Sequence, residues 1–278
     1  MSAFTPGLYI ASTPIGNLDD ITLRALAVLK NSEIILCEDT RRTLKLLNHF
    51  SIKKKLIPYH KFNEKKELNQ IIRYLNEGKI LTLVSDAGTP ALSDPGLSLI
   101  NECILKKIPI FPIPGPSAIT TAMSVSGFED KFLFYGFLPK KDKELERVLL
   151  KLQNIDFAII FFVPSIRLNF YMNKYKLYFS GREILIAREL TKLHETFYRG
   201  DLSEIDLSKL KLKGELTIVI SKKKNKVQLN DSLIRDQVKK YLKKYSLKDV
   251  VELMSKKEKL SKKIIYDICL KIKNEKNI

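Results

Sequence analysis

Short apolar stretches alternate with amphipathic stretches of helical period along the first 136 residues, and this alternation is the strongest constraint on the fold. The strand-like stretches lie at residues 8–12, 33–37, 79–85, 108–113 and 132–136. The helical stretches lie between them, at residues 19–30, 41–50, 64–76, 96–106 and 117–126. A chain that alternates in this way forms βαβ units, whose strands run parallel. The pattern therefore predicts an α/β domain built on a parallel sheet.

Two of these strands run directly into loops that are rich in Gly and Pro and carry small hydroxyl or carboxylate side chains. The loops are residues 84–90 (VSDAGTP) and 112–118 (PIPGPSA). Glycine lets backbone amides approach a ligand closely, and proline stiffens the loop. Because the carboxyl ends of parallel strands meet at one edge of the sheet, the two loops predict a single small-molecule crevice.

A second α/β segment and a helical segment follow. We place a domain boundary in the turn at residues 136–143, where the chain changes from apolar to charged. Beyond it, the sequence predicts helices at 144–153 and 165–178 and strands at 157–163, 183–189, 195–198 and 215–221. From residue 230 the pattern is purely helical, with Ser246 and Asp249 resembling a capping box and Ser261 preceding a further apolar helix face. The expected domains are 1–138, 139–224 and 225–278.

The positive charge is concentrated in the C-terminal segment. The chain of 278 residues has a formal net charge of +18, and residues 221–278 hold 18 Lys and Arg against 7 Asp and Glu. A basic helical module attached to a nearly balanced body is typical of proteins that bind nucleic-acid phosphates. A solvated lysine-rich tail, or a bias in the base composition of the coding DNA, would produce the same count.

Several classes of protein do not match this sequence. The longest strongly apolar run, at residues 157–163, is far shorter than the roughly 20 residues of a membrane span, and the N-terminus has no signal-peptide pattern. We therefore expect a cytoplasmic protein that does not bind membranes. The three cysteines have no CxxC spacing and the three histidines do not pair at ligand spacing, so no metal site is expected.

A series of short motifs, in order along nearly the whole chain, resembles the bacterial ribosomal RNA small subunit methyltransferase I family. The motifs are residues 8–21, 37–41, the two loops above, 136–139, 187–192 and 213–215. That family belongs to the tetrapyrrole methylase superfamily of class III S-adenosylmethionine-dependent methyltransferases. The resemblance implies two α/β domains with the cofactor cleft between them, and a small C-terminal helical domain resembling a helix-turn-helix. It also implies 2′-O-methylation of a cytidine in the decoding region of 16S rRNA within the 30S subunit, by a homodimer.

The resemblance also implies where the cofactor binds. Residues 12–17 (STPIGN) occupy the place where dinucleotide-binding folds carry GxGxxG, and S-adenosylmethionine has no phosphates to cradle. By similarity, the residues that line the cofactor site are Pro14, Asp86, Ala87, Gly88, Thr89, Pro114, Gly115, Ser117 and Ala118. The second domain would contribute Phe162, Ala187 and Leu216 near the adenine. The alternative explanation for Gly88, Pro90, Gly115 and Pro116 is that they form ordinary strand-to-helix turns, and for Asp86 it is a helix or turn cap.

Methyl transfer to a ribose hydroxyl needs alignment of the reacting atoms and a group that accepts the hydroxyl proton. The candidates are Glu38 and Asp39, at the end of the second strand, and Glu64, with Arg41 holding a substrate phosphate or orienting a carboxylate. Asp39 would alternatively cap the helix at 41–50, and Glu64 would simply occupy the first turn of its helix. His60 is a further possible base.

The stretch at residues 161–167 departs from the family. Relatives commonly carry an aromatic-Glu-Ser-x-His-Arg stretch here, whereas this chain has Val163 and Ile166 in place of the Glu and the His. The arginine, Arg167, matches. Any family role for that Glu or His therefore does not transfer.

Two other functions remain open at this point. One is a methylase of a tetrapyrrole or another small molecule on the same scaffold, which would need a substrate cavity but no basic tail. The other is a non-catalytic RNA-binding protein of ribosome assembly, which would not need the ligand loops at residues 84–90 and 112–118.

Overall fold

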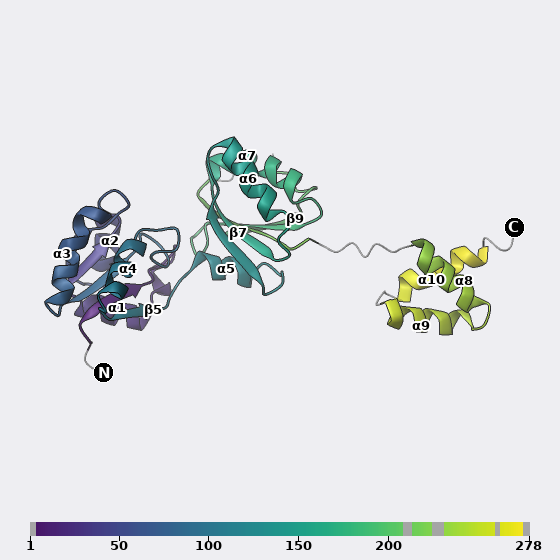
Figure 1. Ribbon diagram of the computed structural model, residues 1–278, viewed down its shortest axis with the longest axis horizontal. Coiled ribbons are helices and arrows are strands. Elements are labelled where there is room, and N and C mark those ends of the chain that lie inside the picture. The colour runs from purple at the N-terminus through teal and green to yellow at the C-terminus, as the bar shows by residue number, and fades with distance from the viewer. Residues whose placement is uncertain (1–3, 208–212, 224–230, 259–261, 275–278) are drawn as a thin grey trace. The chain divides into compact units, whose positions relative to one another are not determined.

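The computed structural model describes residues 4–207, 213–223, 231–258 and 262–274 (Figure 1). The chain divides into two compact units, Met1–Lys223 and Lys224–Ile278. The first unit contains two five-stranded sheets, and the second contains helices.

The first sheet is entirely parallel, which confirms the predicted α/β architecture. Its strands, in the order β3-β2-β4-β1-β5, are β1 (Gly7–Ala11), β2 (Ile34–Cys37), β3 (Lys55–Pro58), β4 (Ile80–Val84) and β5 (Ile110–Ile113). Strand β3 was not predicted from the sequence. This strand lies at the edge of the sheet, and only Ile57 among its four residues is buried, so its apolar signal is weak.

Helices cover both faces of the first sheet because successive strand residues point to opposite faces. Leu8, Leu36 and Leu83 pack with α3 (Glu64–Asn76) and α4 (Leu97–Leu105). Tyr9, Ile35 and Cys37 pack on the opposite face with α1 (Leu23–Asn31) and α2 (Thr40–His49). The helix predicted at 19–30 forms in two parts, a 3₁₀ turn η1 (Leu18–Asp20) and α1, because the Thr22 hydroxyl accepts the Ala25 N–H at 3.1 Å and starts a new helix there.

The second sheet is mixed. Its strands, in the order β6-β7-β10-β8-β9, are β6 (Phe132–Phe137), β7 (Ala158–Pro164), β8 (Glu183–Arg188), β9 (Thr196–Asp201) and β10 (Glu215–Ile220). Strands β6 and β7 are parallel, and the other pairs are antiparallel.

The strand predicted at 132–136 forms, but our placement of it in the first sheet was wrong. It is β6, and it pairs with β7. The turn at 136–143 therefore links β6 to α6 (Asp142–Leu152) inside a βαβ unit, and the chain changes sheet before β6 and not at residues 138–139. Hydrophobic periodicity identifies a strand, but it carries no information about which distant strand becomes its partner.

Helix α5 (Ala118–Ser124) follows the last strand of the first sheet but covers the second sheet (Figure 1). Its Ile119 and Ala122 pack in one cluster with Ile160, Leu185 and Val219. The other face of the second sheet is covered by α6 and by α7 (Leu168–Tyr178), which follows a 3₁₀ turn, η2 (Ser165–Arg167).

Arg182 is buried inside the second sheet region with only 1% of its surface exposed. Its guanidinium donates hydrogen bonds to four backbone carbonyls. These are Gln153 O at 2.8 Å, Ile155 O at 2.7 Å, Ser221 O at 3.1 Å and Phe157 O at 3.4 Å. The Arg182 side chain therefore joins the end of α6, the entry to β7 and the end of β10.

The second unit is a three-helix cluster of α8 (Asp231–Leu242), α9 (Leu247–Glu258) and α10 (Lys262–Asn274) with its own apolar core. The core includes Val238, Val250, Met254, Ile265 and Cys269. Ser246 forms the N-cap half of the predicted capping box, because its Oγ accepts the Asp249 N–H at 3.3 Å. The Asp249 carboxylate accepts the Ser246 hydroxyl at 2.6 Å. Ser261 lies outside the described residues. In the part of the chain that the structure describes, no helix combines the length and the apolar character that a membrane span requires.

Replacement of Arg182 by Met is expected to lower the free energy of unfolding by about 3 kcal/mol, because it leaves several buried carbonyls without donors. Urea unfolding followed by circular dichroism measures this change. Replacement of the exposed Arg147 on α6 by Met serves as the control and should change the value by less than about 0.5 kcal/mol. Equal effects of the two substitutions would contradict the role assigned to Arg182.

Candidate functional site

The loops that follow β1 and β4 are joined at the carboxyl edge of the first sheet. Thr13 and Gly88 exchange backbone hydrogen bonds, with Thr13 N to Gly88 O at 2.9 Å and Gly88 N to Thr13 O at 3.0 Å. The hydroxyls of Ser12 and Thr89 are also hydrogen-bonded, at 2.9 Å. Gly88 has a φ of 78°, a conformation that strongly favours glycine. The turn at residues 12–17 therefore meets the predicted 84–90 loop at this edge of the sheet.

The loop after β5 packs directly on this pair. A Cβ added to Gly115 would lie 3.1 Å from Ser12 Cβ, so glycine permits the close approach of β1 to the loop. Thr22 Oγ1 lies 3.5 Å from Pro114 O. Gly115 is thus explained by packing between the two loops.

A cavity of ≈ 490 Å³ opens beside these loops. One part of its wall comes from the β4 loop and the start of α5, and the other from β6, β7 and β10. Eight of the residues predicted to bind the cofactor line it: Asp86, Ala87, Gly88, Thr89, Ser117, Ala118, Phe162 and Leu216. Pro14, Pro114, Gly115 and Ala187 are not among its lining residues; Ala187 is fully buried in β8, paired with Thr217.

Asp86 connects the cavity to the start of α2. Its Oδ1 accepts the Asp39 backbone N–H at 3.0 Å, and its Oδ2 lies 3.5 Å from Arg42 Nε. Both Asp86 and Arg42 line the cavity. The carboxylate therefore holds the β4 loop against the helix that follows β2.

The structure places Asp39 and Arg41 in an ion pair with each other. Asp39 caps α2 by accepting the Arg41 N–H at 2.8 Å, and its second oxygen lies 2.7 Å from Arg41 Nη2. Hydrogen bonds from the Arg41 side chain and backbone hold the pKa of Asp39 well below its usual range. The Arg41 side chain is 86% exposed, and neither residue lines the cavity. The capping alternative for Asp39 is therefore observed.

Glu64 positions a neighbouring loop, and Glu38 lies in an acidic environment. Glu64 Oε1 accepts the Gly96 N–H at 2.8 Å, which ties the start of α3 to the start of α4. Burial and the nearby Asp86 carboxylate raise the pKa of Glu38, with an opposing contribution from His60. His60 Nδ1 is buried and has no hydrogen-bond partner among the described residues.

Asp94 is a cavity residue that the sequence analysis missed. It lies in the loop between β4 and α4, where Ala91 and Ser93 adopt positive φ values of 65° and 71°. Such strain in non-glycine residues clusters at functional sites. Burial, followed by the Glu38 and Asp86 carboxylates, raises the pKa of Asp94 to about 6 against a smaller opposing hydrogen bond with Ser85. The available sequence signal was an Asp in a Ser-Asp-Pro-Gly turn close to the 84–90 loop.

The residues that depart from the family motif lie at the cavity. Val163 and Ile166 both line it, and Ile166 is 93% exposed. Arg167, the matching residue, donates to Lys140 O at 3.2 Å. This part of the wall is therefore apolar at Val163 and Ile166.

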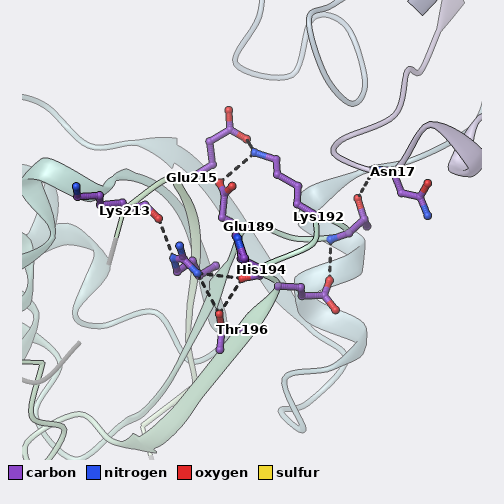
Figure 2. Close-up of polar contacts among 10 residues, drawn as sticks. Asn17, Glu189, Lys192, His194, Thr196, Lys213 and Glu215 are labelled. Carbon is purple, nitrogen blue, oxygen red and sulfur yellow. Dashed lines mark hydrogen bonds and ion pairs between the residues drawn. The ribbon is translucent and has the colours of Figure 1, made fainter. Parts of the chain in front are cut away.

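A polar network borders the cavity where β10 begins (Figure 2). Lys192 Nζ lies 3.0 Å from Glu189 Oε1 and 2.9 Å from Glu215 Oε2, and Glu215 lines the cavity. Across the network, Asn17 N donates to Thr191 Oγ1 at 3.0 Å. The turn after β1 and the wall at β10 therefore meet through residues 189–195.

Comparison with known proteins agrees with this geometry. The sequence matches the family of tetrapyrrole (corrin/porphyrin) methylases over residues 7–206. Among solved structures, the methyltransferase CobJ has a TM-score of 0.61 at 18% identity, covering 78% of this chain and 94% of that one. A uroporphyrin-III C-methyltransferase from Thermus thermophilus, in complex with S-adenyl homocysteine, has a TM-score of 0.56 at 13% identity, covering 77% of this chain and 97% of that one. These likenesses show the fold.

Closer relatives carry the name ribosomal RNA small subunit methyltransferase I. The protein from Thermotoga maritima is 47% identical over 219 residues, which is 78% of this chain and 98% of the relative. The protein from Rickettsia prowazekii is 41% identical over 277 residues, which is 96% of this chain and 97% of the relative. The chain therefore belongs to the tetrapyrrole methylase family and, within it, to the family of ribosomal RNA small subunit methyltransferase I.

Proposed function

We propose that this chain transfers a methyl group from S-adenosylmethionine to the 2′-hydroxyl of a cytidine in the decoding region of 16S rRNA, in the 30S subunit. The observation that carries the proposal is the cavity bordered by the β4 loop and by β6, β7 and β10, which has no glycine-rich phosphate cradle. The close relatives named for small-subunit rRNA methylation support the choice of substrate. A dimeric state and a cytoplasmic location remain predictions.

The cavity residues fit the cofactor chemically. Apolar side chains, Ile15, Ile119, Phe162 and Leu216, suit a purine, and Thr89 and Ser117 supply hydroxyls for orientation. The carboxylates of Asp86 and Asp94 suit a cation in the same cavity. S-adenosylmethionine carries its methyl group on a positively charged sulfur, so the group arrives activated. The protein then has to align the ribose oxygen with the methyl carbon at about 3–3.5 Å.

Asp94 is the best-placed acceptor for the hydroxyl proton. It lines the cavity, whereas Asp39, Glu38 and Glu64 do not, and Asp39 is already engaged with Arg41. A carboxylate whose pKa lies near 6 is ionised at neutral pH and is a stronger base than an ordinary Asp. In this proposal, Glu38 raises the basicity of Asp94, Glu64 holds the Gly96 end of the Asp94 loop, and Arg42 fixes Asp86.

The C-terminal unit supports binding of RNA. Its helices carry exposed lysines, among them Lys239, Lys240, Lys256, Lys262 and Lys263, around a closed apolar core. Lysines contact phosphates without reading sequence. The relative from Thermotoga maritima matches only 78% of this chain over 98% of its own length. A relative with this name therefore matches without about a fifth of the present chain, so we assign the basic unit an added RNA affinity and not the methyl transfer itself.

Methyl transfer from labelled S-adenosylmethionine tests the proposal against its alternatives. We expect incorporation into 30S subunits lacking the modification, and none into a small tetrapyrrole. Naked 16S rRNA, tested in parallel, shows whether the assembled subunit is needed. Methylation of the tetrapyrrole alone would select a small-molecule methylase, and RNA binding without any transfer would select an assembly protein.

Replacement of Asp94 by Asn is expected to reduce kcat by about 100-fold or more, since it removes the proton acceptor. In the wild type, the acceptor works only when ionised, so kcat should fall as the pH drops through about 6 and level off above it. Single-turnover rates across pH 5–8 measure both effects, with the dissociation constant of S-adenosylmethionine as the control for binding.

The Glu38→Gln variant separates the candidate bases. Removal of this like charge should lower the pKa of Asp94 and move the acid limb of the profile to lower pH, with activity retained. Loss of activity in Glu38→Gln together with full activity in Asp94→Asn would transfer the role to Glu38.

Deletion of residues 225–278 is expected to weaken RNA binding steeply and to leave the affinity for S-adenosylmethionine nearly unchanged. The removed lysines account for much of the phosphate contact, so the salt dependence of RNA binding should also become shallower. Filter binding of 16S rRNA at several salt concentrations measures both. Equal RNA affinity before and after deletion would refute an RNA-binding role for the unit.

A further inference from the structure

Residues 189–195, which we name the latch loop, connect two walls of the cavity. On one side, Thr191 Oγ1 accepts the N–H of Asn17 at 3.0 Å, two residues after the cavity residue Ile15. On the other side, Glu189 N–H donates to Glu215 O at 3.0 Å, and Glu215 N–H donates to Glu189 Oε1 at 2.8 Å. The latch loop therefore binds the turn after β1 and the first residue of β10 through separate contacts.

The contact with the turn after β1 is close enough to require glycine. A Cβ added to Gly16 would lie 2.5 Å from Lys192 Cγ, 2.6 Å from Thr191 Oγ1 and 2.7 Å from Leu190 O. Leu190 is buried in the same cluster as Ile15 and Ile119, both of which line the cavity. A displacement of the latch loop would therefore be transmitted to the cavity lining.

The latch loop is held in an unfavourable backbone conformation. Glu189 and Thr191 have φ values of 51° and 63°, although neither is glycine. The Thr191 N–H is satisfied by Glu195 Oε2 at 2.7 Å. Strain of this kind persists only where surrounding contacts over-determine the conformation.

Lys192 supplies the central contact (Figure 2). Its ammonium lies between two carboxylates, Glu189 at 3.0 Å and Glu215 at 2.9 Å. The Lys192 side chain is 30% exposed and that of Glu189 is 20% exposed, so solvent screens this pair only in part. The Glu215 side chain is 71% exposed, so its pair with Lys192 is screened more strongly. Without the ammonium, the two carboxylates would repel each other across the contact that fixes Glu215 in the cavity wall.

We propose that Lys192 is a positioning residue that holds the cavity wall at Gly214 and Glu215 against the latch loop, and thereby sets the affinity for the cofactor. The proposal rests on the function proposed above. Lys192 does not line the cavity, so it acts through Glu215 and leaves the methyl-transfer step itself unchanged.

The test compares Lys192→Met with a matched control in the full-length protein. Lys174 also bridges two carboxylates, Asp142 at 3.1 Å and Glu146 at 2.8 Å, and its side chain is 19% exposed. None of these three residues lines the cavity. We expect Lys192→Met to raise the dissociation constant of S-adenosylmethionine about tenfold, with kcat at saturating cofactor within about twofold of wild type. Lys174→Met should bind the cofactor as the wild type does.

Lys192→Arg provides a rescue, because a guanidinium also donates to two carboxylates. It should restore most of the affinity, which a purely steric role for the lysine would not predict. An unchanged dissociation constant in Lys192→Met, or an equal loss in Lys174→Met, would overturn the proposal and leave the proposed function intact.

Hydrogen–deuterium exchange without cofactor separates the two proposals. Lys192→Met should speed exchange of the Asn17 and Glu215 amides about tenfold, leaving Ile218 in the interior of β10 unchanged. If the wild type fails to bind S-adenosylmethionine, the proposed function is refuted. The exchange rates of the Asn17 and Glu215 amides, measured without cofactor, still test the role of Lys192. Unaltered exchange at Asn17 and Glu215 would then refute it.

Discussion

The paired backbone hydrogen bonds between Thr13 and Gly88 are the contact on which the site depends. They bring together the loops of β1 and β4, which are neighbours in the sheet but lie about seventy residues apart in the chain. In a parallel sheet, the loops that follow the strands all lie at the same edge. Gly88, at a φ of 78°, lets the chain turn at that edge, and Ser12 then contacts both Thr89 and Gly115. The cavity is built outward from this junction.

The second constraint is the passage of the chain from one sheet to the other. After β5 the chain leaves the first sheet, and α5 buries its apolar face on the second. Ser117, Ala118 and Ile119 then lie at the junction and line the cavity. Because the wall comes from elements of both sheets, the cavity needs both, and contacts such as that of Asn17 with Thr191 influence its shape without lining it.

Charge is distributed unevenly around the cavity. Burial and nearby carboxylates raise the pKa values of Glu38 and Asp94, and Arg42 pairs with Asp86. Glu189 and Glu215 instead share an ion pair with Lys192. Partial burial strengthens each of these interactions relative to water. The same fold therefore contains one group of carboxylates that is suited to accept a proton, and a second group, Glu189 and Glu215, that holds the cavity wall in place through Lys192.

The sequence by itself predicted the parallel sheet, the helical C-terminal unit and the ligand loop at residues 84–90, because periodicity and Gly/Pro loops are local signals. The resemblance to a family supplied the twelve proposed cofactor residues, of which eight line the cavity. The sequence misplaced β6, missed β3 and could not separate Asp39 as a base from Asp39 as a cap, since those outcomes depend on distant partners. Only the tertiary structure brought Asp94 to the cavity and raised its pKa, and only it joined Lys192 to Glu215. Burial and electrostatic coupling arise between residues that the chain separates, so a local pattern does not encode them.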